Sequence, residues 1–341
     1  TDAGSKCLVI DRRNHIGGNC YTKNIEQINV HKYGAHIFHT SSKQLWDYIN
    51  RWAEFNSYRH HLKSKIGNEV YSFPINMMTL HQLWGICTPS EAKQKLDEVC
   101  IPIKNPSNLE EWILSKVGYE IYDKFIKGYT KKQWGKHPSS LPASIIQRIP
   151  IRLTYNDCYF NDQYQGIPQG GYTQIFNRML SGINVELGID YLKDKDYFDS
   201  IANKVVYTGA LDEFFDYDSG MLEWRSLKFE EEIHTGDFQG VSVMNYADEN
   251  IPYTRIIEHK HFEFGKQSNT VITKEYPQKW SKGLSKIYPV NDEKNNDLYD
   301  EYKSRVDKRK YTIGGRLADY RYYDMHQAIA YALKAIRKEK G

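Results

Sequence analysis

The feature that most constrains the fold is a pair of similar segments at the two ends of the chain. Near the N-terminus, the apolar residues 7–10 are closed by Asp11 and followed by Gly17 and Gly18. Near the C-terminus, residues 311–313 lead into Gly314-Gly315-Arg316. An apolar strand with an acid or glycines at its carboxyl end is typical of parallel sheets that bind nucleotides. The sequence therefore predicts an α/β fold whose nucleotide-type domain is discontinuous, with other domains inserted between its two ends.

Asp11 has two interpretations. In a dinucleotide-binding βαβ unit, such an acid binds a ribose hydroxyl and stands ~20 residues after a G-x-G-x-x-G turn. Only ten residues precede Asp11, so either the acid merely ends a strand, or the first strand and glycine loop are missing upstream. The bare backbone of Gly17 and Gly18, flanked by Arg12 and Arg13, suits a pyrophosphate. An ordinary glycine turn with solvated arginines is the alternative.

Composition excludes several classes of protein. Among 341 residues, 46 Lys and Arg face 43 Asp and Glu without a long run of one sign, which argues against a nucleic-acid partner. No apolar stretch reaches 18 residues, so we expect no membrane insertion. Five scattered cysteines without a CxxC pair fit a reducing compartment, and we expect a cytoplasmic protein. The 27 Tyr and 7 Trp indicate surfaces that stack rings and donate hydroxyls to a ligand.

The middle of the chain divides into helical and strand-like parts. Residues 77–142 have helical periods, with helix starts at 89–91 and 107–111, where polar caps precede acids. Residues 149–160, 231–246 and 253–264 alternate apolar and polar side chains and predict a half-exposed antiparallel sheet. Residues 205–210 predict a further buried strand that ends at Gly209, and residues 292–300 a polar loop.

Several side chains are candidates for binding a nucleotide. Tyr129 and Trp134 lie among cations and could stack a base, although a buried Trp at a helix end is the alternative. Arg148 and Arg152 would share one face of a strand, and Tyr155, Tyr159 and Tyr164 follow; forked cations and hydroxyls suit a diphosphate. Arg255 adds a cation on another predicted strand.

Histidine pairs offer only a weak metal signal. His36 and His39 lack a supporting Cys or carboxylate cluster in sequence, and His259 and His261 would share a strand face as an ordinary hydrogen-bonded pair. We predict no metal. No nucleophile elbow, Walker loop or H-E-x-x-H motif occurs in the sequence. A bound cofactor is therefore expected to perform the difficult chemical step.

Seven segments, in order over nearly the whole chain, resemble the bacterial UDP-galactopyranose mutases: HKYGAHIFHT (31–40), KGYTKKQWG (127–135), IIQRIPIR (145–152), YQGIPQGGYT (164–173), IPYTRIIEHKHF (251–262), TKEYP (273–277) and GGRLADYRYYDMHQ (314–327). The resemblance implies an isomerase that interconverts UDP-galactopyranose and UDP-galactofuranose for cell-surface polysaccharide. It implies FAD, active when reduced, whose N5 forms an adduct with the anomeric carbon of the sugar while UDP departs and returns.

The resemblance also implies three domains. Residues 1–45, 176–212 and 289–341 would form the Rossmann-like FAD domain, whose first strand and glycine loop the family places upstream of this sequence. Residues 77–142 would form an inserted helical domain with a mobile substrate loop. Residues 46–76, 143–175 and 213–288 would form the antiparallel β-sheet domain. Partners implied are a UDP-galactose substrate, an electron donor for the flavin and a second copy of the chain in a homodimer.

Site roles follow from the matching positions. The resemblance assigns catalysis to Arg148, Arg255 and His36, of which the two arginines hold the diphosphate and His36 lies near the isoalloxazine. It assigns substrate contacts to Phe125, Tyr129, Trp134, Tyr159, Asn245, Tyr288 and Tyr322. It assigns cofactor contacts to Asp11, Gly18, Asn19, Gly209, Arg316, Asp324 and Met325.

Two other functions remain open at this point. An FAD-dependent oxidoreductase of related fold would pass a hydride to the flavin and consume an acceptor, whereas a mutase needs reduced flavin without spending it. A chain without the glycine loop could instead bind a UDP-sugar without flavin and without catalysis.

Overall fold

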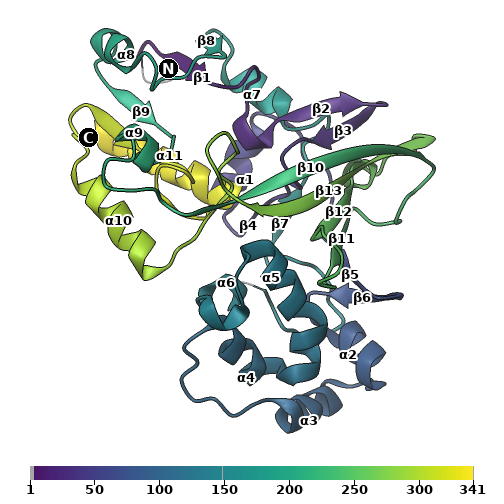
Figure 1. Ribbon diagram of the computed structural model, residues 1–341. Coiled ribbons are helices and arrows are strands. Elements are labelled where there is room, and N and C mark those ends of the chain that lie inside the picture. The colour runs from purple at the N-terminus through teal and green to yellow at the C-terminus, as the bar shows by residue number, and fades with distance from the viewer. Residues whose placement is uncertain (1–3, 148, 341) are drawn as a thin grey trace.

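The computed structural model describes residues 4–147 and 149–340 (Figure 1). Arg148 lies outside the described residues, and its assigned role stays a prediction. Figure 1 shows three groups of elements: a long, twisted sheet, a cluster of helices packed at one end of it, and an α/β part to which both chain ends belong. This arrangement confirms the predicted α/β fold, with helices and a multi-stranded sheet inserted between the two ends.

The α/β part consists of two parallel strand pairs and the helices around them. β1 (Leu8–Asp11) pairs with β8 (Asn184–Leu187), and β9 (Val205–Tyr207) pairs with β15 (Tyr311–Ile313). The helices are η1 (Gly18–Cys20), α7 (Thr173–Met179), α8 (Lys195–Ile201), α9 (Leu211–Phe214), α10 (Glu293–Ser304) and α11 (Met325–Lys340). The strand expected to be buried at 205–210 is only partly buried, since Val206 is 65% exposed. Among the described residues, the pairs β1–β8 and β9–β15 are not joined by a common strand into one larger sheet.

The sheet has seven strands in the order β14-β10-β13-β12-β11-β5-β6. One pair, β11 with β5, is parallel and the other pairs are antiparallel, so the sheet is mixed rather than purely antiparallel. The strands are β5 (Leu62–Ile66), β6 (Glu69–Phe73), β10 (Trp224–Thr235), β11 (Val243–Tyr246), β12 (Arg255–Glu258), β13 (Asn269–Lys279) and β14 (Tyr288–Pro289). Two small antiparallel pairs flank it: β2 (Thr22–Ile25) with β3 (Ile28–His31), and β4 (Phe38–Thr40) with β7 (Tyr164–Gly166).

The helical part begins where the sequence predicts it. Thr88 caps α3 (Pro89–Val99) and Asn108 caps α4 (Leu109–Ile121), each by accepting a hydrogen bond from a backbone N–H three residues on. The other elements of this part are α2 (Met77–Trp84), the π-helical turn η2 (Tyr122–Lys127), α5 (Gly128–Trp134), η3 (Pro138–Ser140) and α6 (Ser144–Gln147). The helix α1 (Lys43–Asn50) lies outside it and packs with β4 and α11. The largest core cluster runs from β5 and β6 through α2 and α4 to η2, which fixes these helices on the sheet. Among the described residues, no helix combines the length and apolar character needed to cross a bilayer.

The strand predicted at residues 149–160 is wrong. Pro150 has no N–H, and the Arg152 N–H donates to Ile75 in the turn before α2, so no ladder forms apart from one bridge between His61 and Cys158. The Arg152 guanidinium is occupied by the carbonyl of Cys158 and by Asn161 and does not share a strand face with another cation.

Two further local predictions are wrong. β12 ends at Glu258 and continues as the 3₁₀ turn η4 (His259–Glu263), so His259 and His261 do not share a strand face. Residues 292–300 are not a loop: Asp292 accepts a hydrogen bond from the Asn295 N–H and starts α10. Tertiary packing stabilises this polar helix, because Tyr299 and Tyr302 are buried on its inner face.

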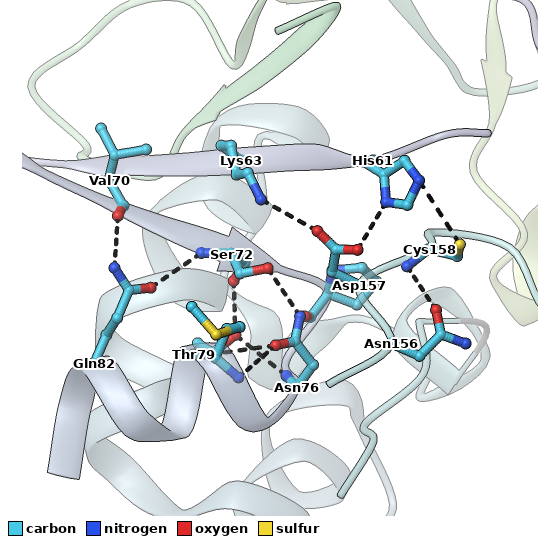
Figure 2. A network of polar contacts seen from close by, with 12 residues as sticks. His61, Lys63, Val70, Ser72, Asn76, Thr79, Gln82, Asn156, Asp157 and Cys158 are labelled. Carbon is cyan, nitrogen blue, oxygen red and sulfur yellow. Dashed lines mark hydrogen bonds and ion pairs between the residues drawn. The ribbon is translucent and has the colours of Figure 1, made fainter. Parts of the chain in front are cut away.

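The start of α2 provides a test of how the helices are fixed to the sheet. Asn76 is fully buried; its Oδ1 accepts from the Met78 and Thr79 N–H groups, and its Nδ2 donates to Ser72 Oγ, 3.0 Å away on β6 (Figure 2). Asn76→Ala leaves these buried groups unpaired, and we expect it to lower the free energy of unfolding by about 2–4 kcal/mol. Urea denaturation measures the loss. The part-buried cap Asn108 is the matched control, and Asn108→Ala should cost about 1 kcal/mol; equal losses would contradict the anchoring role of Asn76.

Candidate active site

The centre of the site is a half-buried cation held between a buried acid and a phenol. Arg255 opens β12 and lies directly opposite Glu275 on β13. Its NH2 group donates to the Tyr129 hydroxyl at 2.6 Å, and its Nε lies 3.3 Å from Glu275 Oε2. The Nε is nevertheless buried without a well-aligned hydrogen bond. The guanidinium therefore joins the sheet, through Glu275, to α5, through Tyr129.

The charges of this pair depend on each other. Burial alone would lower the pKa of Arg255, but Tyr129, Glu275 and Tyr288 together hold that pKa well above its ordinary value. Burial raises the pKa of Glu275, and Arg255 opposes this effect. Because a buried charge is costly unless it is paired, removing either partner would destabilise the other.

An aromatic wall lies beside the pair. Tyr288 on β14 stacks on Tyr322 with ring centroids 6.0 Å apart, and the Arg316 guanidinium lies 4.6 Å from the centroid of the Tyr322 ring. The ring centroid of Trp134, the last residue of α5, lies 6.3 Å from that of Tyr288. Burial, with help from Glu275 and Tyr322, raises the pKa of Tyr288, so its hydroxyl keeps its proton and can donate.

His36 approaches the same centre from the N-terminal part of the chain. Gly34 has a φ of +96°, and a Cβ at this position would lie 2.8 Å from Glu275 Oε1, so the backbone passes directly beside the carboxylate. His36 Nδ1 bonds the Gly34 carbonyl at 2.8 Å. Burial, opposed by this bond and reinforced by Arg316, lowers the pKa of His36 to about 4, so the imidazole is neutral at pH 7.

The predicted cofactor residues gather near the two parallel strand pairs. Asp11 ends β1 and accepts from the Arg13 N–H at 2.9 Å, while Arg13 NH2 donates to Asn19 Oδ1 at 2.8 Å. Gly18 has a φ of +53°, and a Cβ there would meet open space. Gly209 follows β9, and Arg316 follows β15. This donor set, an acid at a strand end, an open glycine turn and an arginine, fits a dinucleotide.

The start of α11 completes this region. The carbonyl of Asp324 accepts the N–H groups of Gln327 and Ala328, and its own N–H donates to Gln327 Oε1 at 3.0 Å. Met325 Sδ lies 3.6 Å from Cys20 Sγ, so the first turn of α11 touches the end of the glycine turn. The first turn of this 16-residue helix therefore lies beside residues predicted to bind the cofactor.

Three predicted substrate residues occupy different surroundings. Asn245 lies on β11, opposite Arg255 of β12. Its Oδ1 is buried without a hydrogen-bond partner, as is expected of an amide that faces a ligand. Tyr159 packs edge-on against His60, with centroids 5.4 Å apart. Phe125 is only 3% exposed and packs on Tyr71 and Phe73, so its ring belongs to the core in this structure.

Two site residues escaped the sequence analysis. Glu275 stands within a quoted family segment but carried no assigned role, although an acid in a strand of mostly buried residues is a usable signal. His60 gave no signal. It is buried with Nδ1 3.0 Å from the Tyr58 hydroxyl, and burial, with the charges of Arg255, His61 and His39, lowers its pKa to about 3.

Comparison with known proteins agrees with this geometry. A family model described as UDP-galactopyranose mutase matches residues 124–322, and one described as an NAD(P)-binding Rossmann-like domain matches residues 1–52. The chain belongs to the UDP-galactopyranose mutase family. Members of this family named for that activity are isomerases.

Individual relatives cover nearly the whole chain. A probable UDP-galactopyranose mutase of Klebsiella pneumoniae is 40% identical over 98% of this chain and 88% of its own length. A dTDP-fucopyranose mutase of Escherichia coli is 38% identical over 96% of this chain and 90% of its own length. A crystal structure of reduced UDP-galactopyranose mutase has the same fold, with a TM-score of 0.75 at 14% identity over 97% of this chain and 89% of that one.

The buried imidazole of His60 predicts an acid-sensitive mutase. Its pKa is about 6.5 in the unfolded chain and about 3 in the folded one, so between these values the unfolded state binds the extra proton. The free energy of unfolding therefore falls as pH falls below 6.5, by ~1.4 kcal/mol per pH unit. Between pH 7 and 5, His60→Gln should lose about 2 kcal/mol less than the native chain in urea titrations. His81→Gln, at an exposed histidine, serves as control. If His60→Gln loses as much unfolding free energy between pH 7 and 5 as the native chain does, the assignment is refuted.

Proposed function

We propose that this chain interconverts UDP-galactopyranose and UDP-galactofuranose. The observation that carries the proposal is the Arg255 centre, where a half-buried guanidinium lies among Tyr129, Tyr288 and Glu275. This centre adjoins a region whose donors fit a dinucleotide. Family membership and the 40% identical relative from Klebsiella pneumoniae give the same substrate class.

The chain's own residues bind and retain the substrate. Arg255, together with Arg148, binds the diphosphate, and Tyr159, Tyr288 and Tyr322 donate hydroxyls to it. Tyr129 flanks the uracil, Phe125 supports this end of the site from the core, and Trp134 and Asn245 line the sugar end. Because the guanidinium stays charged, it stabilises the departing UDP and keeps it close until the sugar ring has reclosed. Neutral His36 stays close to the reacting centre without adding a charge.

FAD is the proposed cofactor. Asp11, Gly18, Asn19, Gly209, Arg316, Asp324 and Met325 would hold it at the carboxyl ends of β1, β9 and β15. When bound in its reduced form, FAD would supply through N5 the nucleophile for the anomeric carbon. An electron donor keeps it reduced, and the product serves cell-surface polysaccharide synthesis. We also expect a cytoplasmic homodimer.

A second substrate, dTDP-fucopyranose, is favoured by a specific observation. The Escherichia coli relative named for that sugar is 38% identical, close to the 40% of the Klebsiella pneumoniae relative. The two sugar nucleotides share the diphosphate and differ in the base, in the 2′-hydroxyl of the pentose and in the hydroxyl on C6 of the hexose. Arg255 therefore serves either substrate, and discrimination rests with residues around the base and the sugar.

The deciding experiment follows both conversions in one protein preparation. Purified protein with added FAD and dithionite is incubated with UDP-galactofuranose or dTDP-fucofuranose, and the pyranose products are separated by chromatography. We expect conversion of the uridine nucleotide only under reducing conditions, because the reaction needs reduced flavin without consuming it. Stoichiometric use of an electron acceptor would indicate an oxidoreductase, and UDP binding without flavin or conversion would indicate a non-catalytic binder.

Substitution of Arg255 separates its charge from its shape. Arg255→Lys keeps a cation but loses the planar fork, and we expect kcat/KM to fall by about 10- to 100-fold, the equivalent of one charged hydrogen bond. The visible spectrum should show that flavin remains bound. Arg309→Lys, at a side chain 94% exposed on the far loop, is the matched control. Unchanged kcat/KM in Arg255→Lys would remove Arg255 from the substrate site.

A further inference from the structure

A thiol, an imidazole and a carboxylate lie in line on the surface next to the proposed active site. His61 directly precedes β5, and an isolated antiparallel bridge pairs it with Cys158. Asp157 is adjacent to Cys158 in sequence. Figure 2 shows the three side chains pointing toward one another, with Lys63 on the far side of Asp157. None of these residues has a role in the proposed mutase reaction.

The order of the contacts defines what each group can do. Cys158 Sγ lies 3.9 Å from His61 Nε2, and His61 Nδ1 lies 2.8 Å from Asp157 Oδ1. Because Nδ1 faces a carboxylate, it carries the ring proton, and Nε2 is left with a lone pair directed at the thiol. The arrangement matches the pattern in which a nucleophile faces a base that a third group orients.

The surroundings favour separated charges on this triad. Burial alone would raise the pKa of Asp157, but His61 and Lys63 outweigh it and hold that pKa below its ordinary value. Lys63 Nζ is 3.2 Å from Asp157 Oδ2. Arg152 donates to the carbonyl of Cys158, so a guanidinium also faces this turn. The charged groups around the thiol are thus three cationic or protonatable side chains and one carboxylate.

The triad is accessible from solvent. The His61 side chain is 40% exposed and the Asp157 side chain 30% exposed, and Cys158 is itself partly exposed. The backbone N–H of Cys158 donates to Asn156 Oδ1 at 3.0 Å, which holds the backbone of this turn. Small reagents can therefore approach the thiol from solvent.

A second cysteine in the same protein serves as an internal comparison. Cys87 Sγ lies 3.6 Å from His81 Nδ1, closer than the corresponding distance at Cys158. That same nitrogen faces the Ile86 carbonyl at 3.0 Å, so it carries the proton and cannot accept another from the thiol. Cys87 is also exposed. The two sites therefore share proximity and access and differ in the availability of a base.

We propose that Cys158 is a reactive thiol and a modification site for hydrogen peroxide and small soft electrophiles, with His61 as its base and Asp157 as the group that orients His61. The thiol proton moves to His61 Nε2, and the thiolate attacks one oxygen of the peroxide. The O–O bond breaks as the S–O bond forms, and the departing hydroxide takes the proton from the imidazolium and leaves as water. Sulfur is oxidised to the sulfenic acid, and the peroxide is reduced.

Modification has a direct route to the proposed active site. Cys158 precedes Tyr159, whose N–H donates to the His60 carbonyl at 2.7 Å. The same two-stranded contact therefore carries the triad and the Tyr159–His60 ring pair. A group added to the sulfur must displace His61 and shift this contact, so we expect modification to lower turnover. This consequence rests on the proposed function, whereas the reactivity of the thiol does not.

The reactivity is tested by labelling the full chain with limiting iodoacetamide at pH 7 and following each cysteine by peptide mass spectrometry. We expect Cys158 to react about tenfold or more faster than Cys87, because the thiolate is the reacting species. His61→Gln should reduce the Cys158 rate to that of Cys87, and Asp157→Asn should reduce it partly. Equal rates at the two cysteines, or a fast Cys158 that His61→Gln leaves unchanged, would overturn the proposal. An unchanged far-ultraviolet circular dichroism spectrum of each variant shows that the chain is folded.

Peroxide provides the second readout. After hydrogen peroxide treatment, a dione probe specific for sulfenic acids should label Cys158 in the native chain and fail to label it in His61→Gln. Labelling that is equal in the two proteins would overturn the role of His61. For turnover, iodoacetamide-labelled and desalted protein should lose activity that Cys158→Ser retains, because the alkylated sulfur, unlike a sulfenic acid, is not reduced by the dithionite of the assay. Equal loss in Cys158→Ser would overturn the link to turnover, and the labelling rates would then decide the reactive thiol independently of the mutase reaction.

Discussion

The ion pair between half-buried Arg255 and buried Glu275 is the interaction on which the arrangement of the site depends. Each charge would be costly without the other, so β12 and β13 must keep the register that places the two residues opposite one another. The same pair draws in Tyr129 from α5 and forces the backbone at Gly34 to pass beside the carboxylate. The helical part, the sheet and the N-terminal segment therefore meet at one guanidinium.

Two further cations hold α5 in place for this contact. Lys132 Nζ donates to four backbone carbonyls of the loop between β11 and β12, and burial lowers its pKa to about 8. Arg225 on β10 donates to the carbonyls of Lys132 and Gln133 at the C-terminal end of the helix, where cations are favoured. The helix that presents Tyr129 and Trp134 is thus fixed by polar contacts from the sheet, so the aromatic residues of the proposed base site cannot move independently of Arg255.

Local sequence patterns succeeded where short-range forces decide the structure. The starts of α3 and α4 follow from caps at Thr88 and Asn108, whose side chains satisfy N–H groups three residues away. Local patterns failed where contacts with residues distant in sequence decide the structure. Residues 149–160 alternate like a strand, yet their polar groups pair with the turn before α2 and with each other. The polar sequence of α10 does not predict a helix, because the stability of this helix comes from Tyr299 and Tyr302, which pack into a separate core cluster.

The sequence by itself determined the nucleotide-type ends of the chain, the helical insertion and the family, because these are carried by local periodicity, capping and contiguous motifs. The same motifs predict the site residues. Only the tertiary structure decided which charged groups form ion pairs and which ionisable groups are neutral. Glu275 became part of the site because strand pairing placed it opposite Arg255, and His60 is neutral because burial removes water from its ring. Cys158 and His61 stand 97 positions apart, and their contact arises from backbone pairing between segments that no local pattern connects. Electrostatic and proton-transfer properties depend on the distances between groups and on their exposure to solvent. Both are set by the folded structure and cannot be derived from the order of residues alone.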